Sequence, residues 1–171
     1  MSQFIPLTDD LSMKKLDPTD DKDLWLASKL DEDEFIAGKN GYLWSICNLL
    51  QNTRYLYWDS CKGPYGIYYQ NDPVGYFDID QLFGISSCAE LSYAILSTER
   101  KKSYAFQTLL AAQSFIFEEF SMMQLTIRQD NQASKNLAIK CQFESVYTEQ
   151  QARQQGFYEY RKTKEKFLHR G

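Results

Sequence analysis

The amino-acid sequence predicts an α/β protein of the α+β type, with a central, mostly antiparallel mixed sheet of about six to seven strands flanked by about four helices. Three observations predict this fold class. Residues 65–96 divide into short apolar segments separated by turn residues, which is typical of neighbouring antiparallel strands. Residues 102–120 repeat apolar side chains at helical spacing. Residues 123–128 then alternate apolar and polar side chains, which indicates a further strand.

The first part of the chain predicts one strand followed by two helices. Residues 11–16 alternate apolar and polar side chains, as a strand does. Residues 17–20 supply a turn and a helix cap, so a helix is expected over residues 21–30. A second helix is expected over residues 41–52, where apolar side chains gather, and residues 55–64 carry no clear pattern.

The middle of the chain predicts an antiparallel meander. Residues 65–69 and 74–79 flank residues 70–73, in which Asn-Asp-Pro predicts the turn of a hairpin. A third strand is expected over residues 89–96. These three segments follow one another closely enough to form neighbouring strands.

The last part of the chain alternates helix and strand. A long helix over residues 102–120 and a strand over residues 123–128 are followed by Asp130 and Asn131, which cap another helix. Residues 143–167 are expected to form two strands around a Gln-Gln-Gly turn.

Composition excludes several classes of protein. The chain has 171 residues, enough for one domain with a sizeable core, and 43% of them are hydrophobic. No window approaches the roughly 20 apolar residues that a membrane-spanning helix needs. The first residues lack the basic and apolar segments of a secretory signal. We therefore expect a cytoplasmic protein that does not associate with membranes.

Charge and reactive residues narrow the chemistry further. The net charge of −4 argues against nucleic-acid binding. The four cysteines match no paired metal-ligand spacing, so no metal is expected. The single histidine, His169, lies in a basic tail and gives little support to Ser-His-Asp chemistry. The acidic first forty residues have two interpretations: an entrance that attracts a cationic amine, or solvated helix faces and strand edges.

A basic turn precedes the long helix. Arg100, Lys101 and Lys102 stand where a strand leads into a helix N-terminus. Unpaired backbone N–H groups and the helix dipole favour an anion at such a position. The turn is therefore either a phosphate-binding site or an ordinary solvated turn.

Three segments taken together resemble the core of the GNAT N-acetyltransferases. They are residues 90–96 (ELSYAIL), 100–105 (RKKSYA) and 131–143 (NQASKNLAIKCQF). Their order and spacing are closest to the branch that acetylates the N-termini of ribosomal proteins. The resemblance implies a single acetyltransferase domain over residues 1–171, with acetyl-coenzyme A (acetyl-CoA) as cosubstrate. It implies an amine acceptor, either a protein N-terminus or a small molecule, and a monomer or homodimer.

The resemblance also implies a set of cofactor-binding residues. The family's loop Gln/Arg-x-x-Gly-x-Gly/Ala wraps the pyrophosphate with backbone N–H groups, and the matching residues here are Arg100, Lys101, Lys102, Ser103, Tyr104 and Ala105. The preceding strand would splay at a bulge and pair its backbone with the pantetheine arm through Ala94, Ile95, Leu96 and Ser97. Asn131 and Ser134 would lie beside the pantetheine and the thioester, with Lys140 toward the phosphates. Asn131 is equally a helix cap, and Lys140 equally a solvated helix residue.

Three positions depart from the family pattern. Ser103 replaces a glycine, and its side chain narrows the approach of a phosphate unless its hydroxyl donates to it. Gln142 replaces the glycine that closes the last helix, so that turn needs a left-handed residue or another geometry. Ala138 stands where many GNAT enzymes carry a tyrosine that protonates the leaving thiolate, and Ser134 becomes the candidate near the sulfur.

Catalysis requires a neutral amine and a polarised thioester carbonyl. Neutralising a protein α-amine at pH 7 costs roughly 1 kcal/mol, and a lysine roughly 4 to 5 kcal/mol. Glu90, where the family often has glutamate, is the candidate general base acting through water; its alternative is an exposed or ion-paired strand residue. A backbone N–H near Ile95 or Leu96 is the expected donor to the carbonyl.

Acceptor recognition is expected from the two N-terminal helices and the final hairpin. The aromatic side chains available for it are Trp44, Trp58, Tyr65, Tyr68, Tyr69 and Tyr158. Aromatic residues at such spacings are also ordinary core residues. Two further functions stay open: an acyl-CoA-binding module without turnover, and an interaction protein whose basic turn binds an acidic partner.

Overall fold

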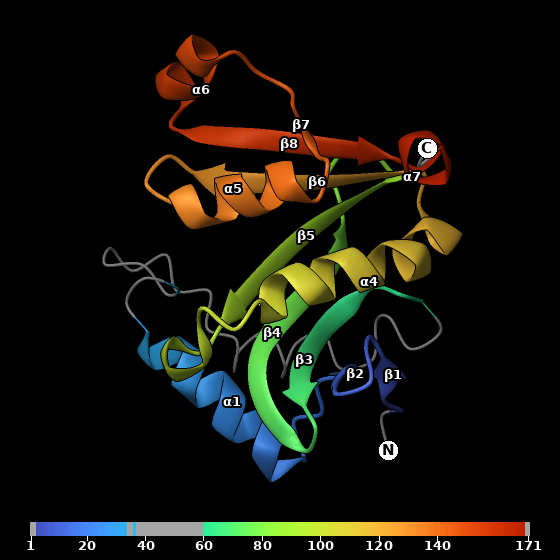
Figure 1. Cartoon of the computed structure of the whole chain (residues 1–171), viewed down its shortest axis with the longest axis vertical. Coiled ribbons are helices and arrows are strands. Elements are labelled where there is room, and N and C mark those ends of the chain that lie inside the picture. The colour runs from blue at the N-terminus through green and yellow to red at the C-terminus, as the bar shows by residue number, and fades with distance from the viewer. Residues whose placement is uncertain (1–2, 34–35, 37–59, 170–171) are drawn as a thin grey trace. The chain divides into compact units, whose positions relative to one another are not determined.

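The computed structural model describes residues 3–33, 36 and 60–169, and these residues form two compact units. The N-terminal unit contains Met1–Asp78 and Tyr93–Ala111, and the C-terminal unit contains Ile79–Ser92 and Ala112–Gly171. The strands follow one another in the order β1-β2-β3-β4-β5-β6-β8-β7 (Figure 1). The eight strands of the described residues exceed the expected six to seven, because no pattern in the sequence indicated the short β1.

The N-terminal unit begins with antiparallel strands. β1 (Ile5–Pro6) pairs with β2 (Leu11–Lys15), and β2 pairs along its length with β3 (Gly63–Tyr69). Most residues of β2 and β3 are buried, including four in succession from Tyr65 to Tyr68, so β3 is covered on both faces. The strands expected at residues 11–16 and 65–69 are therefore confirmed.

The turn of the first long hairpin differs from its prediction. β4 (Asp72–Gln81) follows β3 in both sequence and strand order after only Gln70 and Asn71. A two-residue connection joins antiparallel neighbours, and Gln70 has the left-handed φ of 55° that such turns favour. Asp72 and Pro73, expected in the turn, are instead the first residues of β4.

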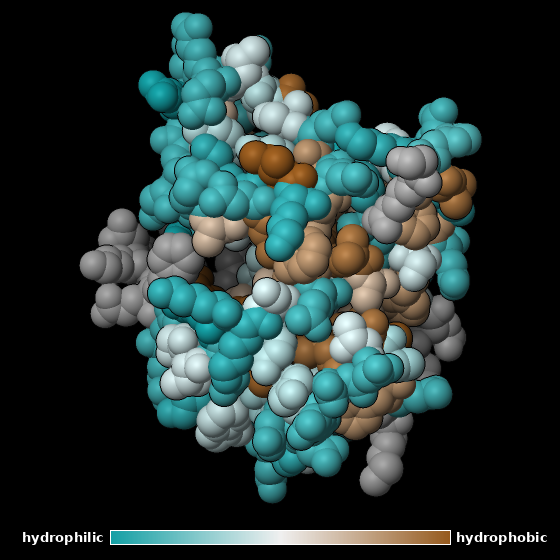
Figure 2. Space-filling model, in the orientation of Figure 1, coloured by the Kyte–Doolittle hydropathy of each residue, from teal (hydrophilic) through white to brown (hydrophobic). Residues whose placement is uncertain are grey.

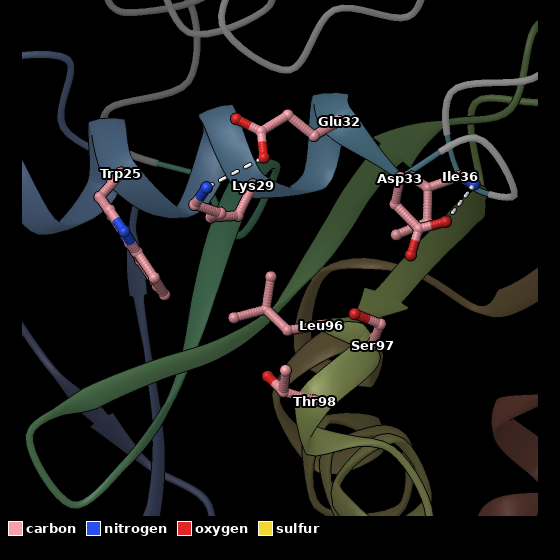
Figure 3. A pocket seen from close by; sticks show the side chains of 8 residues that line it. All are labelled: Trp25, Lys29, Glu32, Asp33, Ile36, Leu96, Ser97 and Thr98. Carbon is pink, nitrogen blue, oxygen red and sulfur yellow. Dashed lines mark hydrogen bonds and ion pairs between the residues drawn. The ribbon is translucent and has the colours of Figure 1, made fainter.

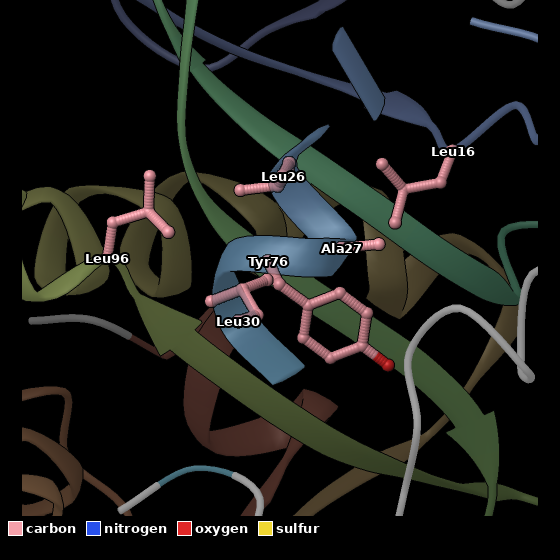
Figure 4. Packing of buried hydrophobic residues seen from close by; sticks show 6 residues of the cluster. All are labelled: Leu16, Leu26, Ala27, Leu30, Tyr76 and Leu96. Atoms are coloured by element: carbon pink, nitrogen blue, oxygen red, sulfur yellow. The ribbon is translucent and has the colours of Figure 1, made fainter. Parts of the chain in front are cut away.

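Helix α1 (Asp21–Glu32) confirms the first predicted helix and its cap. The Asp20 side chain accepts hydrogen bonds from the backbone N–H groups of Lys22 and Asp23. The buried face of α1 forms a hydrophobic cluster within the N-terminal unit (Figure 4), which contains Leu16, Leu26, Ala27, Leu30, Tyr76 and Leu96. The helix expected at residues 41–52 lies outside the described residues, as do Trp44 and Trp58.

Three elements, β4, β5 (Cys88–Ile95) and α4 (Tyr104–Glu119), continue from one unit into the other. β5 runs into the short 3-10 helix η1 (Ser97–Glu99), and a turn then leads to α4. The six residues between β4 and β5 are too few for a parallel crossover, which agrees with the predicted meander. Both β5 and α4 confirm their predictions within two residues.

The C-terminal unit holds a mixed set of strands. β5 pairs with β6 (Met122–Arg128) in parallel, whereas β8 (Phe157–Thr163) pairs antiparallel with β6 and with β7 (Glu144–Ser145). α5 (Gln132–Lys140) follows β6 as predicted.

The end of the chain is more helical than its prediction. α6 (Glu149–Gln155) occupies part of a segment expected to be strand, and α7 (Lys164–Leu168) follows β8. Thr148 and Gln151 form a reciprocal capping box on α6, and Gly156 ends the helix with a left-handed φ of 90°. Local capping therefore prevails over the weak strand pattern of this segment.

One buried lysine marks the helix-covered face of β8. Lys162 is 1% exposed and donates to the Gln113 side chain of α4 at 2.8 Å and to the Cys141 carbonyl that follows α5 at 2.9 Å. The residues of β8 that share its face, Tyr158 and Tyr160, are also buried. Residues on the opposite face, such as Arg161, point away from these contacts.

On the face drawn in Figure 2, hydrophilic residues cover most of the surface and hydrophobic residues occupy smaller areas between them. Among the described residues, no helix has the length and apolar character needed to cross a membrane.

Candidate functional site

The turn before α4 has a strained backbone. Lys101 and Ser103 adopt left-handed φ angles of 65° and 64°, with Lys102 between them. L-residues pay a steric cost in this region, whereas glycine does not. This conformation gives the physical reason for a glycine at the position of Ser103 in the related loop motif.

The same turn presents a row of unused donors. Within the described part of the chain, the backbone N–H groups of Lys101, Lys102, Ser103, Tyr104 and Ala105 have no hydrogen-bond acceptor. The first bond of α4 is made by the N–H of Gln107, which donates to the Ser103 carbonyl at 3.0 Å. Consecutive N–H groups in alternating conformations at a helix N-terminus form a concave anion site. The geometry therefore fits a pyrophosphate.

The three cations of the turn have different surroundings. The Arg100 guanidinium donates to Asp33 at 2.6 Å and to the Ile95 carbonyl at 3.1 Å. Lys102 forms an ion pair with Glu99 at 2.6 Å, which raises the pKa of Lys102 through that hydrogen bond. The exposed Lys101 side chain has no ion pair or hydrogen bond among the described residues. Lys101 is therefore the cation best placed to contact an added anion, and Arg100 instead ties the turn to α1 and β5.

Leu96, which follows β5, is held by contacts within the N-terminal unit. The Leu96 N–H donates to the Val74 carbonyl at 3.0 Å, and the Leu96 side chain is buried in the hydrophobic cluster. The Leu96 N–H is therefore already occupied, so of the two predicted donors to a thioester carbonyl only the Ile95 N–H stays a prediction. Ser97 begins η1 and is exposed.

A pocket of about 440 Å³ lies between α1 and η1 within the N-terminal unit (Figure 3). Trp25 and Lys29 line it from α1, and Leu96 and Thr98 line it from the opposite side. Its two carboxylates are already engaged, because Glu32 pairs with Lys29 at 2.9 Å and Asp33 pairs with Arg100. The described part of the pocket therefore has both apolar and charged walls. Glu32 and Asp33 belong to the acidic residues that were expected to attract a cation, but both are already paired with a cation of the chain.

The parallel ladder of the C-terminal unit contains Glu90. This ladder joins Cys88–Leu91 to Met122–Leu125, and β5 and β6 both continue beyond it. A ladder that ends before its strands do is the arrangement expected from the predicted splay. Glu90 is half-buried near the end of the ladder and accepts a hydrogen bond from the Thr126 hydroxyl at 3.2 Å.

Helix α5 carries the other predicted polar residues. Asn131 is its N-cap, with the side chain accepting the Ser134 N–H at 3.1 Å. The Ser134 hydroxyl has no hydrogen-bond partner among the described residues, and it lies one turn before the buried Ala138. Lys140 is exposed in the last turn, roughly 13 Å along the helix from Asn131. The cap explains the Asn131 side chain, whereas the roles of Ser134 and Lys140 remain predictions.

Most of the aromatic side chains expected to line a substrate pocket belong to the core. Tyr65 is buried with its hydroxyl donating to the Cys61 carbonyl, and the buried Tyr68 donates to Asp23. Tyr158 is also buried. Only Tyr69, of the described members of this set, has substantial exposure, and its ring packs against Tyr104 at 5.3 Å between centroids.

Solved structures share this fold over almost the whole chain. RimL, a ribosomal L7/L12 α-N-protein acetyltransferase in complex with coenzyme A, has a TM-score of 0.70 and 18% identity over 96% of this chain and 99% of its own. A GNAT-family acetyltransferase from Bacillus anthracis has a TM-score of 0.74 and 15% identity over 95% and 99%. The chain has the GNAT fold. A spermidine N-acetyltransferase SpeG chimera from Vibrio cholerae and hSSAT has a TM-score of 0.74 and 17% identity over 95% and 100%.

Sequence comparison gives no such match. No protein-family model matches the chain, and no curated protein matches it significantly. The GNAT fold is therefore established by the arrangement of the strands and helices.

Two departures from the GNAT motifs keep the backbone that glycine normally provides. Ser103 is left-handed, as described above, and Gln142 has a φ of 64°. After α5, the Gln142 N–H donates to the Ile139 carbonyl and the Phe143 N–H to the Ala138 carbonyl, both at 2.9 Å. These two bonds form a Schellman motif. Of the two alternatives left open by the sequence, a left-handed residue or another geometry, the chain adopts the left-handed residue at Gln142.

Sequence reasoning missed the residues that hold the predicted site residues in place. Asp33 anchors Arg100, and Thr126 contacts Glu90. Gln124 and Arg161 extend the contacts of Thr126 across two strands. The alternation of β6 and β8 could have placed Thr126, Gln124 and Arg161 on predictable faces, but only the strand register brings them together.

Proposed function

We propose that this protein is an N-acetyltransferase that moves the acetyl group of acetyl-CoA to a primary amine by direct attack in a ternary complex. The row of unused N–H groups from Lys101 to Ala105 carries the proposal, since it fits a pyrophosphate at the place where the GNAT fold presents its cofactor loop. The structure of RimL with coenzyme A, which shares this fold, supports it.

Within the N-terminal unit we assign the pyrophosphate to the backbone of this turn and to the Lys101 ammonium. Arg100 and Lys102 act through their ion pairs with Asp33 and Glu99, which fix the turn. The exposed Ser103 hydroxyl can donate to a phosphate oxygen. The Ile95 and Ser97 backbone remains the proposed contact of the pantetheine arm.

Within the C-terminal unit we assign the proton transfers to two side chains. Bound acetyl-CoA would supply the thioester whose carbonyl carbon the amine attacks. As the N–C bond forms and the C–S bond breaks, Glu90 accepts one proton from the amine nitrogen through water. The Ser134 hydroxyl donates a hydrogen bond to the departing thiolate, which then takes a proton from solvent.

A protein N-terminus is the acceptor that we propose first. A protein α-amine is neutralised at a cost of roughly 1 kcal/mol at pH 7, so a half-exposed carboxylate acting through water suffices. A polyamine is the alternative acceptor, because a spermidine N-acetyltransferase shares the fold. Neutralising an amine near pKa 10.4 would cost roughly 4 to 5 kcal/mol.

The first experiment measures the melting temperature with and without acetyl-CoA and free coenzyme A. A ligand at 100 times its Kd stabilises the fold by about 2.7 kcal/mol, which corresponds to about 5–10 °C for a domain of this size. Lys101→Ala should reduce this rise more than Lys102→Ala, because Lys102 is already paired with Glu99. No rise at millimolar ligand would contradict the cofactor site and favour an interaction protein.

Turnover is tested next by thiol release with a peptide α-amine, a lysine side chain and a polyamine. Glu90→Gln should lower turnover while leaving the cofactor-induced rise in melting temperature nearly intact. Unchanged turnover would exclude Glu90 as the base. Cofactor binding without turnover of any amine would instead indicate an acyl-CoA-binding module.

A further inference from the structure

A row of polar side chains crosses three strands of the C-terminal unit beside Glu90. Glu90 is paired in register with Gln124 of β6, and Gln124 is paired in register with Arg161 of β8. Side chains of directly paired residues share a face, and Thr126 shares it because it lies two residues along β6. This is the face opposite Lys162 and its contacts with α4 and α5.

The hydrogen bonds of this row all run toward Glu90. Arg161 Nε donates to Gln124 Oε1 at 2.6 Å, Gln124 Nε2 donates to Thr126 Oγ1 at 3.4 Å, and Thr126 Oγ1 donates to Glu90 Oε1 at 3.2 Å. A guanidinium can only donate, and an ionised carboxylate can only accept. The two ends therefore fix the orientation of the Gln124 amide and of the Thr126 hydroxyl between them.

Burial makes this orientation costly to reverse. Gln124 is 2% exposed, so each end of its amide requires a partner. Rotating the amide would place an NH₂ group against the Arg161 guanidinium and leave two donors facing each other. The Thr126 hydroxyl oxygen therefore accepts a hydrogen bond from the Gln124 amide, and the Thr126 hydroxyl proton is donated to Glu90.

The charges at both ends of the row act on the buried thiol of Cys88, two residues before Glu90 on β5. Burial raises the pKa of Cys88 to about 11, while the charge of Arg161 lowers it and the charge of Glu90 raises it. The other charged and titratable groups on this face among the described residues include Asp80 of β4, Arg128 of β6, Glu144 of β7 and Glu159 of β8. The bonds from the Leu82 N–H to the Cys88 carbonyl and from the Leu96 N–H to the Val74 carbonyl set the register that places Asp80 opposite Glu90. Glu159 lies 3.9 Å from the Arg161 guanidinium, and Glu144 pairs with Lys166.

We propose that Arg161, Gln124 and Thr126 form a positioning relay that holds the Glu90 carboxylate in one orientation for proton acceptance. The proposal rests on the proposed function, since it explains how Glu90 is held in place as the proposed base. None of the three relay residues contacts substrate. Each acts through the next, and the second oxygen of Glu90, which has no hydrogen bond in the described part of the chain, faces the reaction.

The relay is tested by removing one donor at a time. Thr126→Val removes the hydroxyl with little change in shape, Thr126→Ser restores it, and Arg161→Met removes the charge at the far end. Arg153→Met is the matched control, because Arg153 is an exposed arginine of α6 in the same unit. Circular dichroism and thermal melting establish that each variant is folded.

Two readouts are measured on the full chain. The first is the ¹³C chemical shift of the Glu90 side-chain carboxyl as a function of pH, which needs no activity. The second is the pH profile of kcat/KM for acetyl transfer. Thr126→Val should move both the NMR midpoint and the acidic limb of the profile to higher pH, and lower kcat/KM about tenfold at pH 7, as expected for one hydrogen bond to a charged group.

The outcomes separate the two proposals. Thr126→Ser and Arg153→Met should behave like the wild type, and Arg161→Met should shift in the same direction as Thr126→Val. An unchanged NMR midpoint in both Thr126→Val and Arg161→Met overturns the relay even if acetyl transfer is observed. Absence of transfer in the wild type overturns the proposed function, while the NMR titration still decides whether the relay controls the charge of Glu90.

Discussion

Replacing Ser103 by glycine should stabilise the protein, although the substitution adds no contact. Ser103 has a φ of 64°, a region that costs an L-residue about 1–2 kcal/mol. Glycine avoids that cost but loses about 0.5–1 kcal/mol through the greater freedom of the unfolded chain. The exposed Ser103 side chain has no hydrogen bond within the described residues, so nothing else is lost. The net gain is about 0.5–1 kcal/mol.

Urea denaturation of the full chain measures this gain as a rise in the midpoint at constant m. In thermal melting the gain corresponds to roughly 1–4 °C for a chain of this length. Gln142→Gly is a parallel test, because Gln142 has the same φ of 64° at the end of α5. Lys102→Gly is the control, since Lys102 lies in the same turn without a positive φ and should lose about 0.5–1 kcal/mol.

The same variant tests the cofactor loop. Removing the Ser103 side chain opens the approach to the adjacent N–H groups, so Ser103→Gly should bind coenzyme A at least as tightly as the wild type. A Ser103→Gly protein that is less stable than the wild type would refute the strain argument. Weaker binding with higher stability would show instead that the Ser103 hydroxyl is a phosphate donor.

Three further predictions concern the buried polar groups. Lys14→Met should lower the free energy of unfolding by about 3–5 kcal/mol in urea, because it leaves the fully buried Asp23 without the ammonium 3.2 Å away. Stability should also fall at both pH extremes, as measured by urea midpoints from pH 2 to 11. The hydrogen bond from Lys14 lowers the pKa of Asp20 from 3.8, so its contribution is present above that value and is lost as the pH falls through the lowered pKa. Burial lowers the pKa of Lys14, but its bonds and charges with Asp20 and Asp23 outweigh burial and raise it from 10.5, so this contribution is lost as the pH rises through the raised pKa. Finally, Lys162→Ala should cost about 1–3 kcal/mol more than Lys162→Met in denaturation, because methionine keeps the buried stem and alanine leaves a cavity.

The elements that could be predicted from the sequence are those with a long apolar period. α4 repeats its buried residues over sixteen positions, and β6 alternates apolar and polar residues over positions 123–128, so each pattern identifies its element without tertiary information. α6 has seven residues, one of them buried, and its only signal was the Thr148 and Gln151 capping box. β1 is a two-residue strand whose pairing depends on β2, which local sequence does not encode.

The position of the candidate site in the chain could be predicted from the sequence, but the side-chain contacts that support it could not. The turn before α4 stands out because strand, cations and helix follow one another in sequence. The contact of Arg100 with Asp33 joins residues 67 apart in sequence, and that of Arg161 with Gln124 joins residues 37 apart. Such pairs follow from the strand order and the register, which a single sequence does not specify. Polar residues in strands could be assigned to a face, but their partners could not.

The two replaced glycines explain how a chain can keep this fold while departing from its sequence pattern. At Ser103 and Gln142 the backbone keeps the left-handed conformation, and the hydrogen bonds of the Schellman motif after α5 are both made. A glycine at each position would lower the free-energy cost of the positive φ. Replacing glycine by another residue therefore destabilises the fold by about 1 kcal/mol but leaves the direction of the backbone N–H groups unchanged. A sequence motif that requires glycine does not match the chain at these positions. The row of N–H groups from Lys101 to Ala105, which would bind a pyrophosphate, depends only on the backbone conformation. Ser103→Gly and Gln142→Gly combined should therefore stabilise the protein additively, because the two turns lie in different units and share no partner among the described residues.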